Sequence, residues 1–350
     1  MAVYKNERGS WNYKCYYTTW DGKYKQRKRE GFKTRKEAVA KEAEFLNSCK
    51  TDITITFSNL AASYLEDSKA RVKPTTYETK ENMIRTKLLP YFGDFSIASI
   101  DTITVRKWQN EIIAGNYKPT YQKVIHNQLS AILNYAIKYY GLQSNAAAKC
   151  GSIGKKKSDN IQFWTLEEFR QFIQSVENNP TTKTIFYLLF FSGMREGELL
   201  ALTLGDFDFE ANTVDINKTY ARIKGQTIIQ EPKTPKSKRK IVLPKFIMDM
   251  IKDYANQLYA YKSTERLFNV AKNYLHRAMT KYSNISGVKR IRIHDLRHSH
   301  ASMLIELNIS PLAISERLGH EDVQTTLNVY SHLYPNKQNE IANTLESLAI

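Results

Sequence analysis

The spacing of apolar residues changes twice along this 350-residue chain, and this change points to several domains rather than one core. The first fifty residues carry strand signals followed by one helix signal, the next hundred follow the 3.6-residue period of helices, and the remainder mixes both patterns. At ordinary domain sizes a chain of this length forms two or three domains. We therefore predict a multidomain, mainly α-helical protein with small β-sheets. The expected domains are 1–50, 51–150 and 161–350, with a linker at 151–160.

The first fifty residues predict a small sheet followed by one helix. Trp11 to Tyr17 is rich in aromatic residues and favours a strand, and Asp21-Gly22 is a hairpin signal. The basic run Lys23 to Arg29 then favours the returning strand. A capping-box pattern at Thr34 to Glu37 predicts a helix from about Arg35 to Cys49.

The net charge of +17 makes a polyanion the expected partner, the alternative being a merely basic soluble protein. The returning strand carries basic side chains on both faces, so one face could contact DNA. The alternative is a solvated edge strand that its charge protects from pairing. The residues expected to contact DNA are Lys23, Lys25, Arg27, Lys28 and Arg29 in this strand and Lys155, Lys156 and Lys157 in the linker.

Residues 51–150 predict an all-helical unit. Apolar residues at helical spacing indicate four helices, with one break at Lys73 to Thr76 and another at Leu89 to Gly93. The last two helices are expected at Ile103 to Ile113 and at Tyr121 to Tyr140. Together they would surround one core.

Helices and a small antiparallel sheet alternate in the remainder, which follows the polar, basic, glycine-containing linker segment Lys149 to Ser158. A capping box at Thr165 to Glu168 opens one helix, an apolar helix covers Thr181 to Phe191, and a third begins at about Arg195. The strands are expected at Thr213 to Tyr220, Thr227 to Gln230 and Lys240 to Leu243, with helices from Pro244 onward.

Cysteine usage and hydropathy favour a cytoplasmic protein without a membrane partner. Cys15, Cys49 and Cys150 are far apart and support neither a disulfide framework nor a zinc site. The N-terminus has no apolar stretch for a signal peptide, and the most apolar run, Ile185 to Phe191, is too short to cross a bilayer.

Two clusters in the last domain carry side chains suited to a phosphate. Arg195 follows a glycine at a predicted helix start, where a bound anion would be shared with the helix N-terminus. Glu198 at i+3 could orient it, and a surface arginine–glutamate pair is the alternative. His294 and Arg297 share a helical face, and their imidazole and guanidinium groups are suited to binding two oxygens of a phosphate.

A metal site is the rival interpretation of the second cluster, because His294 and His298 are spaced i, i+4. The sequence HDLRH lacks the glutamate of the zincin helix, however, and Arg297 would repel a dication. We therefore expect no metal.

The third cluster is His320, which follows the expected helix-capping Gly319, and Tyr330. A tyrosine can attack a phosphodiester and form a covalent phosphotyrosyl enzyme, while arginines neutralise the growing charge. A lysine could protonate the leaving sugar oxygen. The phosphotyrosyl bond retains much of the phosphodiester's free energy, so no cofactor is expected. Nothing intrinsic to the cluster distinguishes Tyr330 from Tyr334.

The segments SGMREGELLAL, HDLRHSHAS, LGH and VYSH, in this order and spacing, resemble the signature of tyrosine recombinases of the phage integrase kind. The resemblance implies that Tyr330 is the nucleophile rather than Tyr334. It also implies a catalytic lysine on a β-hairpin turn, where Lys233 fits best and Lys236 and Lys238 remain alternatives. The implied catalytic set is Arg195, Lys233, His294, Arg297, His320 and Tyr330.

The earlier domains resemble the same family. Residues 51–150 are similar to its helical core-binding domain. Residues 1–50 resemble a three-stranded, AP2-like arm-binding domain with one helix, found in integrases of phages and conjugative transposons. The match rests on Trp11, Asp21-Gly22 and Gly31 to Thr34. Residues 161–350 would then be the mixed α+β catalytic domain.

The resemblance implies double-stranded DNA with core and arm attachment sites as substrate, in the cytoplasm of a bacterial host. It also implies a homotetramer that exchanges C-terminal segments, with Pro335 to Ile350 as the candidate segment. DNA-bending and excisionase accessory proteins are further partners of such enzymes. The alternatives are a type IB topoisomerase-like enzyme and a catalytically inactive DNA-binding relative.

Overall fold

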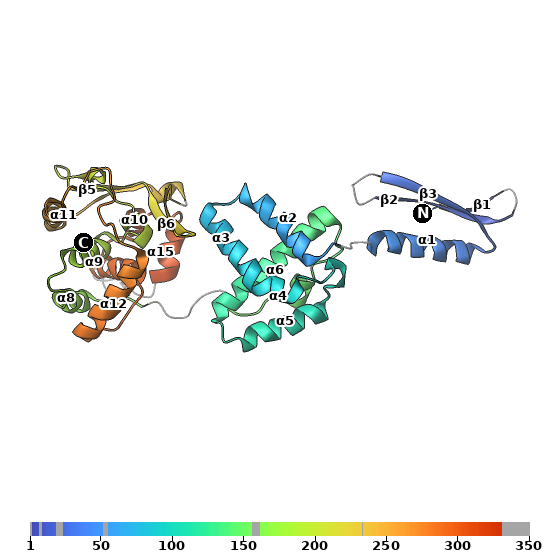
Figure 1. Ribbon diagram of the computed structural model, residues 1–350, viewed down its shortest axis with the longest axis horizontal. Helices are drawn as coiled ribbons and strands as arrows, with labels where there is room; N and C mark the ends of the chain where they lie inside the picture. Colours follow the sequence, from blue (N-terminus) through green and yellow to red (C-terminus); the bar gives the residue numbers. More distant parts are fainter. Residues whose placement is uncertain are drawn as a thin grey trace, which may run out of the picture. The chain divides into compact units, whose positions relative to one another are not determined.

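The chain divides into two compact units, Met1–Ser158 and Asp159–Ile350 (Figure 1). Both are mainly helical with small antiparallel sheets, as predicted. No helix in the part of the chain that the structure describes is both long and apolar enough to cross a membrane. The structure, a computed structural model, describes residues 2–6, 9–18, 24–51, 55–155, 162–232 and 234–330.

The first unit begins with three strands and one helix. β1 (Ala2–Lys5), β2 (Trp11–Thr18) and β3 (Tyr24–Phe32) pair antiparallel in the order β1-β2-β3, and α1 (Arg35–Thr51) runs along one face of the sheet (Figure 1). The strand, the returning strand and the helix are confirmed. β1 was implied only by the family resemblance, because its four residues are too few to show a period. The hairpin signal Asp21-Gly22 lies outside the described residues.

The helical part of the first unit surrounds one apolar core. Its large buried side chains include Phe57, Phe92 and Trp108. The elements are α2 (Phe57–Lys69), α3 (Pro74–Met83), the π-helix η1 (Ile84–Leu88), α4 (Leu89–Phe92), the 3₁₀ turn η2 (Ile97–Ser99), α5 (Thr102–Ala114), α6 (Pro119–Tyr140) and α7 (Ala146–Cys150).

The second predicted helix of this part passes through a proline before it ends. Pro90 lacks an N–H, and its ring would clash with the carbonyl four residues earlier in a regular α-helix. The chain widens to a π turn, in which the N–H of Leu89 donates to the carbonyl of Ile84. The helix therefore continues to Phe92 and ends at Gly93, inside the predicted break.

Part of the expected linker packs on this helical core. α7 extends to Cys150, the side chain of Ile153 is buried, and the N–H of Lys155 donates to the carbonyl of Pro119 at 3.2 Å. Residues 151–155 are therefore packed on the core and are not part of the free linker expected there, because the apolar side chain of Ile153 is buried there. Residues 156–161 lie outside the described part of the chain.

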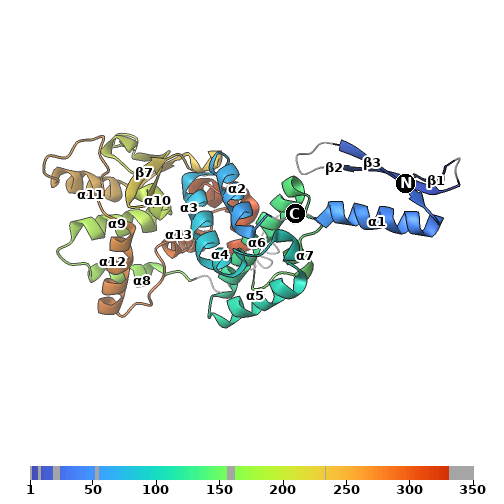
Figure 2. The same cartoon turned by 45° about the vertical axis from the view of Figure 1, so that its right-hand side comes forward.

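The second unit is built around α9, which is apolar on nearly all sides and is accordingly buried. α13 packs beside it (Figure 2). The capping box that opens α8 is confirmed, with the Thr165 hydroxyl and the Glu168 carboxylate both bonded to backbone N–H groups. The helices are α8 (Leu166–Gln174), α9 (Pro180–Ser192), α10 (Glu196–Leu199), α11 (Lys245–Asn256), α12 (Lys272–Ser286), α13 (Asp295–Glu306), α14 (Pro311–Leu318) and α15 (Val323–Tyr330).

The strands of the second unit form two sheets, so the prediction of a single sheet was wrong. The expected strand Thr213 to Tyr220 is interrupted at Asn217 and Lys218, where the Lys218 ammonium binds the Asp206 carboxylate at 2.7 Å. The apolar alternation is itself broken there, because Asn217, Lys218 and Thr219 are three successive polar residues. One sheet has the order β4 (Phe207–Asp208), β5 (Thr213–Ile216), β8 (Arg239–Val242), and the other pairs β6 (Thr219–Ile223) with β7 (Gln226–Gln230). Two 3₁₀ turns, η3 (Leu204–Asp206) and η4 (Pro235–Ser237), flank these strands.

Candidate active site

Arg195 stands at the junction where α9 ends and α10 begins. Gly193 caps α9 with a φ of +66°, and a Cβ atom there would lie 2.6 Å from Cδ2 of His300 and 2.7 Å from Cδ2 of Leu318. Only glycine fits this backbone and this space. The turn delivers Arg195 to the N-cap of α10, close to the first turn of α13.

One buried carboxylate orients two guanidinium groups. Glu198 is 2% exposed and accepts a hydrogen bond from Nη1 of Arg195 at 2.7 Å. It also accepts hydrogen bonds from Nη1 and Nη2 of Arg239 at 3.2 and 3.0 Å. Burial raises the pKa of Glu198, but the charge and hydrogen bonds of Arg239, followed by those of Arg195, outweigh it and leave the pKa below its ordinary value. The ionised carboxylate therefore fixes both arginines, as the i, i+3 spacing predicted for Arg195.

Arg297 lies at the carbonyl ends of two helices. Its side chain is buried, Nη1 donates to the Gly193 carbonyl at 2.9 Å, and Nη2 donates to the Leu318 carbonyl at 2.6 Å. A cation is favoured at a helix C-terminus, where unpaired carbonyl oxygens gather. Burial first, and then the charges of Arg195 and Arg239, lower its pKa to about 9. Arg239 donates to the carbonyl of Arg317, the neighbour of Leu318, at 2.8 Å, so the three guanidinium groups form one cluster.

The two predicted histidines lie in the same cluster as neutral rings. His320 follows Gly319, which caps α14 in the left-handed conformation as expected, and its Nδ1 is hydrogen-bonded to Oγ1 of Thr326 at 2.8 Å. Desolvation, followed by Arg297 and Arg195, lowers its pKa to about 3. His294 reaches solvent at the N-cap of α13, yet desolvation by the surrounding protein atoms lowers its pKa to about 4.

Tyr330 lies against this cluster within its own chain. Its side chain is 2% exposed and packs with Ile305, Ile314 and Leu318. Its hydroxyl is hydrogen-bonded to Nδ1 of His298 at 2.5 Å. Burial raises the pKa of the phenol above 10, against the opposing charge of Arg297.

The lysine-rich turn also approaches the cluster. Oγ of Ser237, in η4, lies 3.5 Å from Nη1 of Arg195. The Lys236 ammonium donates to the carbonyl of Glu321, next to His320, whereas the Lys238 ammonium binds the exposed carboxylate of Glu231. Lys233 and Tyr334 lie outside the described residues.

Two residues of the cluster were missed by the sequence analysis. His298 was weighed only as a metal ligand, and Arg239 was not singled out. Arg239 carried a usable signal, because in the strand Arg239–Val242 it shares the buried face of Ile241. Within the described part of the chain, no group of three or more histidine, cysteine, aspartate or glutamate side chains could hold a metal ion.

Comparison with known proteins assigns the chain to a family. The model of the phage integrase family matches residues 162–337, just over half of the chain. The chain belongs to the phage integrase family. Its members are tyrosine recombinases, enzymes that cut and rejoin DNA strands in site-specific recombination. A SAM-like N-terminal domain of phage integrases matches residues 56–113, and an arm DNA-binding domain matches residues 1–49.

The chain is similar to known integrases over most of its length. The ICEBs1 integrase of Bacillus subtilis is 28% identical over 340 residues, which cover 90% of each chain. A tyrosine recombinase described as XerC-like, from Caldanaerobacter subterraneus, is 27% identical and covers 91% of each chain. Among solved structures, the Tn1549 transposon integrase in complex with transposon right-end DNA has a TM-score of 0.69 at 19% identity, covering 85% of this chain and all of that one. A lambda integrase dimer bound to a COC′ core site has a TM-score of 0.62 at 16% identity, and the match covers 96% of this chain and 95% of that one.

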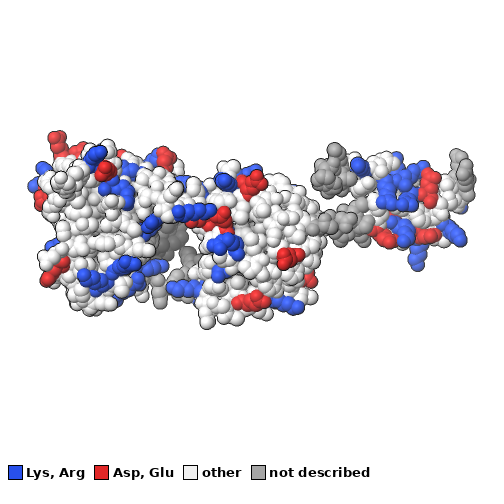
Figure 3. Space-filling model, viewed as in Figure 1, with Lys and Arg blue, Asp and Glu red and all other residues white. Residues whose placement is uncertain are grey.

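The basic residues of the integrase's β3 divide between the two faces of the sheet. Arg27, opposite Cys15, lies 3.9 Å above the ring of Phe45 in α1. Lys28, opposite Lys14, lies on the face that α1 leaves open. Lys and Arg side chains gather over these strands (Figure 3). Lys25 and Arg29 are exposed, Lys155 packs its backbone on the helical core, and Lys23, Lys156 and Lys157 lie outside the described residues.

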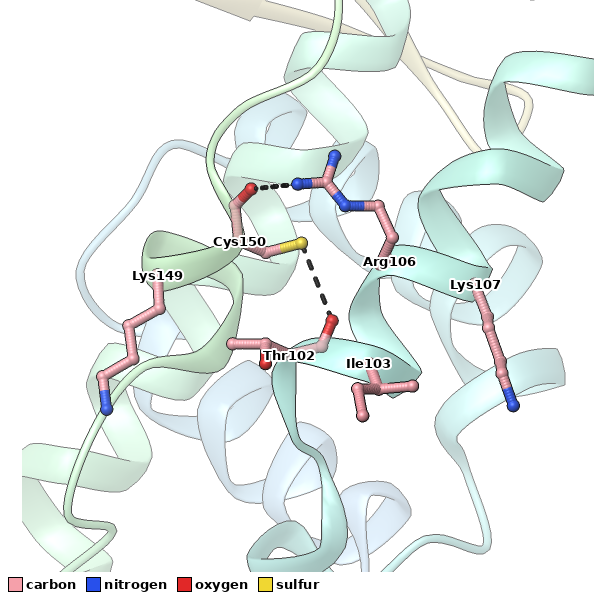
Figure 4. A pocket seen from close by; sticks show the side chains of 6 residues that line it. All are labelled: Thr102, Ile103, Arg106, Lys107, Lys149 and Cys150. Atoms are coloured by element: carbon pink, nitrogen blue, oxygen red, sulfur yellow. Dashed lines mark hydrogen bonds between the residues drawn. The ribbon is translucent and has the colours of Figure 1, made fainter.

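A shallow pocket of about 400 Å³ lies on the helical part of the integrase (Figure 4). Arg106 donates to the carbonyl of Cys150, while Lys107 and Lys149 extend away from one another on either side (Figure 4). The three cations do not converge on one point, so the pocket is not built to hold a single anion.

Proposed function

We propose that this integrase cuts and rejoins DNA at attachment sites of a phage or other mobile element through a 3′-phosphotyrosyl intermediate. The observation that carries the proposal is the cluster of three guanidinium groups, Arg195, Arg239 and Arg297, beside the phenol of Tyr330. Arg195 and Arg239 share the single carboxylate of Glu198. Among the described residues, Arg297 has carbonyl oxygens rather than a carboxylate as its partners. The cluster therefore carries surplus positive charge, which an incoming phosphate would neutralise.

The proposed reaction is a transfer of the phosphoryl group to tyrosine and back. The phenolic oxygen of Tyr330 attacks phosphorus, the bond to the 5′ oxygen breaks, and Lys233 protonates that oxygen as it leaves. Arg195 and Arg297 hold the non-bridging oxygens, and neutral His294 and His320 donate hydrogen bonds to them. Attack by the 5′ hydroxyl of another strand on the phosphotyrosine then rejoins DNA.

The same proposal assigns a part of the DNA to each domain. Residues 1–50 would bind arm sites, residues 51–150 and residues 161–350 would each bind the core site, and 151–160 would be the linker. The match of an arm DNA-binding domain supports the first assignment. The candidate DNA contacts are Lys23, Lys25, Arg27, Lys28, Arg29, Lys155, Lys156 and Lys157.

We also propose a homotetramer on DNA, exchanging the segment Pro335 to Ile350 between protomers and aided by DNA-bending and excisionase proteins. A lambda integrase tetramer bound to a Holliday junction, with a TM-score of 0.59 at 17% identity, supports the assembly. It covers 91% of this chain and 95% of that one.

The test of the nucleophile is a comparison of Tyr330→Phe with Tyr334→Phe on duplex DNA that carries the attachment site. We expect Tyr330→Phe to abolish covalent protein–DNA adducts while leaving DNA binding intact, and Tyr334→Phe to retain them. Persistence of adducts in Tyr330→Phe, together with their loss in Tyr334→Phe, would refute the assignment. Recombination of a plasmid only when it carries cognate sites distinguishes an integrase from a topoisomerase, which relaxes any supercoiled plasmid.

A further inference from the structure

The proposed reaction, as described so far, assigns no acceptor to the phenolic proton of Tyr330. The phenol of Tyr330 must lose its proton as its oxygen attacks, and burial makes that loss harder by raising the pKa above 10. The proposed lysine acid acts on the leaving oxygen, and the arginines remain charged throughout. A separate group must therefore receive the phenolic proton.

The hydroxyl of Tyr330 already contacts such a group. Nδ1 of His298 lies 2.5 Å from it, and the two ring centroids are 5.6 Å apart. His298 is half-buried, and its pKa lies below its ordinary value, mainly because of desolvation. The ring is therefore neutral near pH 7. In the tautomer that carries its proton on Nε2, the lone pair of Nδ1 faces the phenol.

The groups around His298 suit a ring that gains a proton only during the reaction. Asp295, whose carboxylate is bonded by Arg292, favours the charged form of His298. The positive charges of Arg292 and Arg297 oppose it, and the ring of His294 lies edge-on at 5.4 Å between centroids. Once a phosphate enters beside Arg297, its negative charge offsets that opposition.

We propose that His298 holds the phenol of Tyr330 and receives its proton when the phenolic oxygen attacks the phosphate. This inference rests on the proposed function, with Tyr330 as the nucleophile. The phenolic O–H bond breaks and the proton passes to Nδ1 as the bond from oxygen to phosphorus forms. The bond from phosphorus to the 5′ oxygen breaks, and its electron pair leaves with that oxygen, which is protonated by the lysine acid. During rejoining the imidazolium returns its proton to the departing phenolate.

A hydrogen bond at the preceding turn of α15 supports this position of the phenol. Thr326 lies four residues before Tyr330, so the two side chains share one face of the helix. The bond from Thr326 to His320 thus fixes the same face of α15 that presents the phenol to His298. The nucleophile and its proton acceptor are held together before DNA arrives.

The test compares His298→Asn and His298→Ala with the unchanged enzyme in single-turnover cleavage. Asparagine keeps an oxygen near the position of Nδ1 that accepts the phenolic hydrogen bond, but it takes up no proton near neutral pH. The matched control is His276→Asn, an exposed histidine on α12 outside the cluster. The DNA is a duplex carrying the core site, which is mapped beforehand from the 5′ ends of trapped phosphotyrosyl complexes.

We expect His298→Asn to lower the cleavage rate at pH 7 by a factor of about 10² or more, the usual contribution of a general base, with DNA binding unchanged. The unchanged enzyme should reach a plateau once the pH exceeds the lowered pKa of His298, whereas the rate of the variant should keep rising with pH as hydroxide replaces the lost base. Replacing the 5′ bridging oxygen with sulfur, which leaves without an acid, should rescue Lys233→Ala but not His298→Asn.

A wild-type rate and pH profile in His298→Asn would overturn the inference, and so would its rescue by the sulfur substrate. If His298→Ala fails to fold, His298→Asn still decides the matter, since it retains a polar group of similar size. Loss of adducts in Tyr330→Phe beside normal cleavage in His298→Asn would reject only the role of His298. Persistent adducts in Tyr330→Phe would reject the proposed function itself.

Discussion

Replacing Glu198 with glutamine removes the one negative charge that holds Arg195 and Arg239 together. Of the two partners, Arg239 dominates the stability of the folded chain, because its side chain is 7% exposed whereas that of Arg195 is 37% exposed. Removing one partner of a buried ion pair costs about 3–5 kcal/mol. The amide keeps one acceptor oxygen, so we expect the lower end, about 3 kcal/mol of unfolding free energy.

This loss translates into a measurable thermal shift of the second unit, Asp159–Ile350. For a unit of this size, 1 kcal/mol lowers the midpoint by about 2–4 °C, so we expect Glu198→Gln to lower it by about 6–12 °C. Scanning calorimetry of the full chain is the suitable assay, because the first unit then serves as an internal reference. The matched control, Glu210→Gln, changes an exposed glutamate of the same unit and should shift the midpoint by less than about 2 °C.

The difference between the unchanged enzyme and Glu198→Gln should also depend on pH. The pKa of Glu198 in the folded chain lies below its ordinary value of 4.5. Its stabilising contribution is therefore complete above pH 4.5 and is lost as the pH falls through the lowered folded-state pKa. The two proteins should converge in acid. Equal midpoints at pH 7, or a gap that widens in acid, would refute the claim that Glu198 acts as a buried anion.

Two further predictions, each with a matched control, concern the first unit. Gly154→Ala should lower the free energy of unfolding by about 2–4 kcal/mol, because a Cβ atom there would lie 1.9 Å from the carbonyl oxygen of Pro119. In the same denaturation experiment, the control Gly141→Ala should cost only about 1 kcal/mol, because Gly141 also has a positive φ but faces open space. Lys28→Ala should reduce the slope of log affinity against log salt concentration for arm-site DNA by about 1. Arg27→Ala should instead chiefly destabilise the fold. A reduced slope in Arg27→Ala and an unchanged slope in Lys28→Ala would place the DNA on the other face of the sheet.

The local features of the fold were predictable because they depend on residues close in the sequence. The capping box at Thr165 and the glycine caps at Gly193 and Gly319 are set by the chemistry of one helical turn. The order of the motifs around Arg195 and Arg297 was likewise readable from the sequence alone. These short-range rules placed the candidate site at the ends of specific helices before any geometry was known.

Features that depend on distant contacts were not predictable in the same way. Lys218, where the expected strand Thr213 to Tyr220 is interrupted, binds the carboxylate of Asp206 twelve residues earlier, and the strand's own residues do not reveal this partner. The role inferred for His298 depends on α15 returning to α13, and helical spacing alone suggested a metal ligand instead. The position of Ile153 in the core shows the same limit, since one apolar side chain in a basic stretch carries no period.

The site keeps its positive charge available for a phosphate because, among the described residues, Glu198 is the one carboxylate bonded to its three guanidinium groups. A second carboxylate bonded to these arginines would hold them equally well, but it would also repel the substrate and cancel part of the field that stabilises the transition state. Arg297 is instead held by the carbonyl ends of α9 and α14, which supply partial charges that a strong anion can still outcompete. His294 and His320 stay neutral, because desolvation and the neighbouring arginines lower the pKa of both rings. The cluster thus presents oriented hydrogen-bond donors with surplus positive charge, and the negative charge of a phosphodiester would neutralise that surplus.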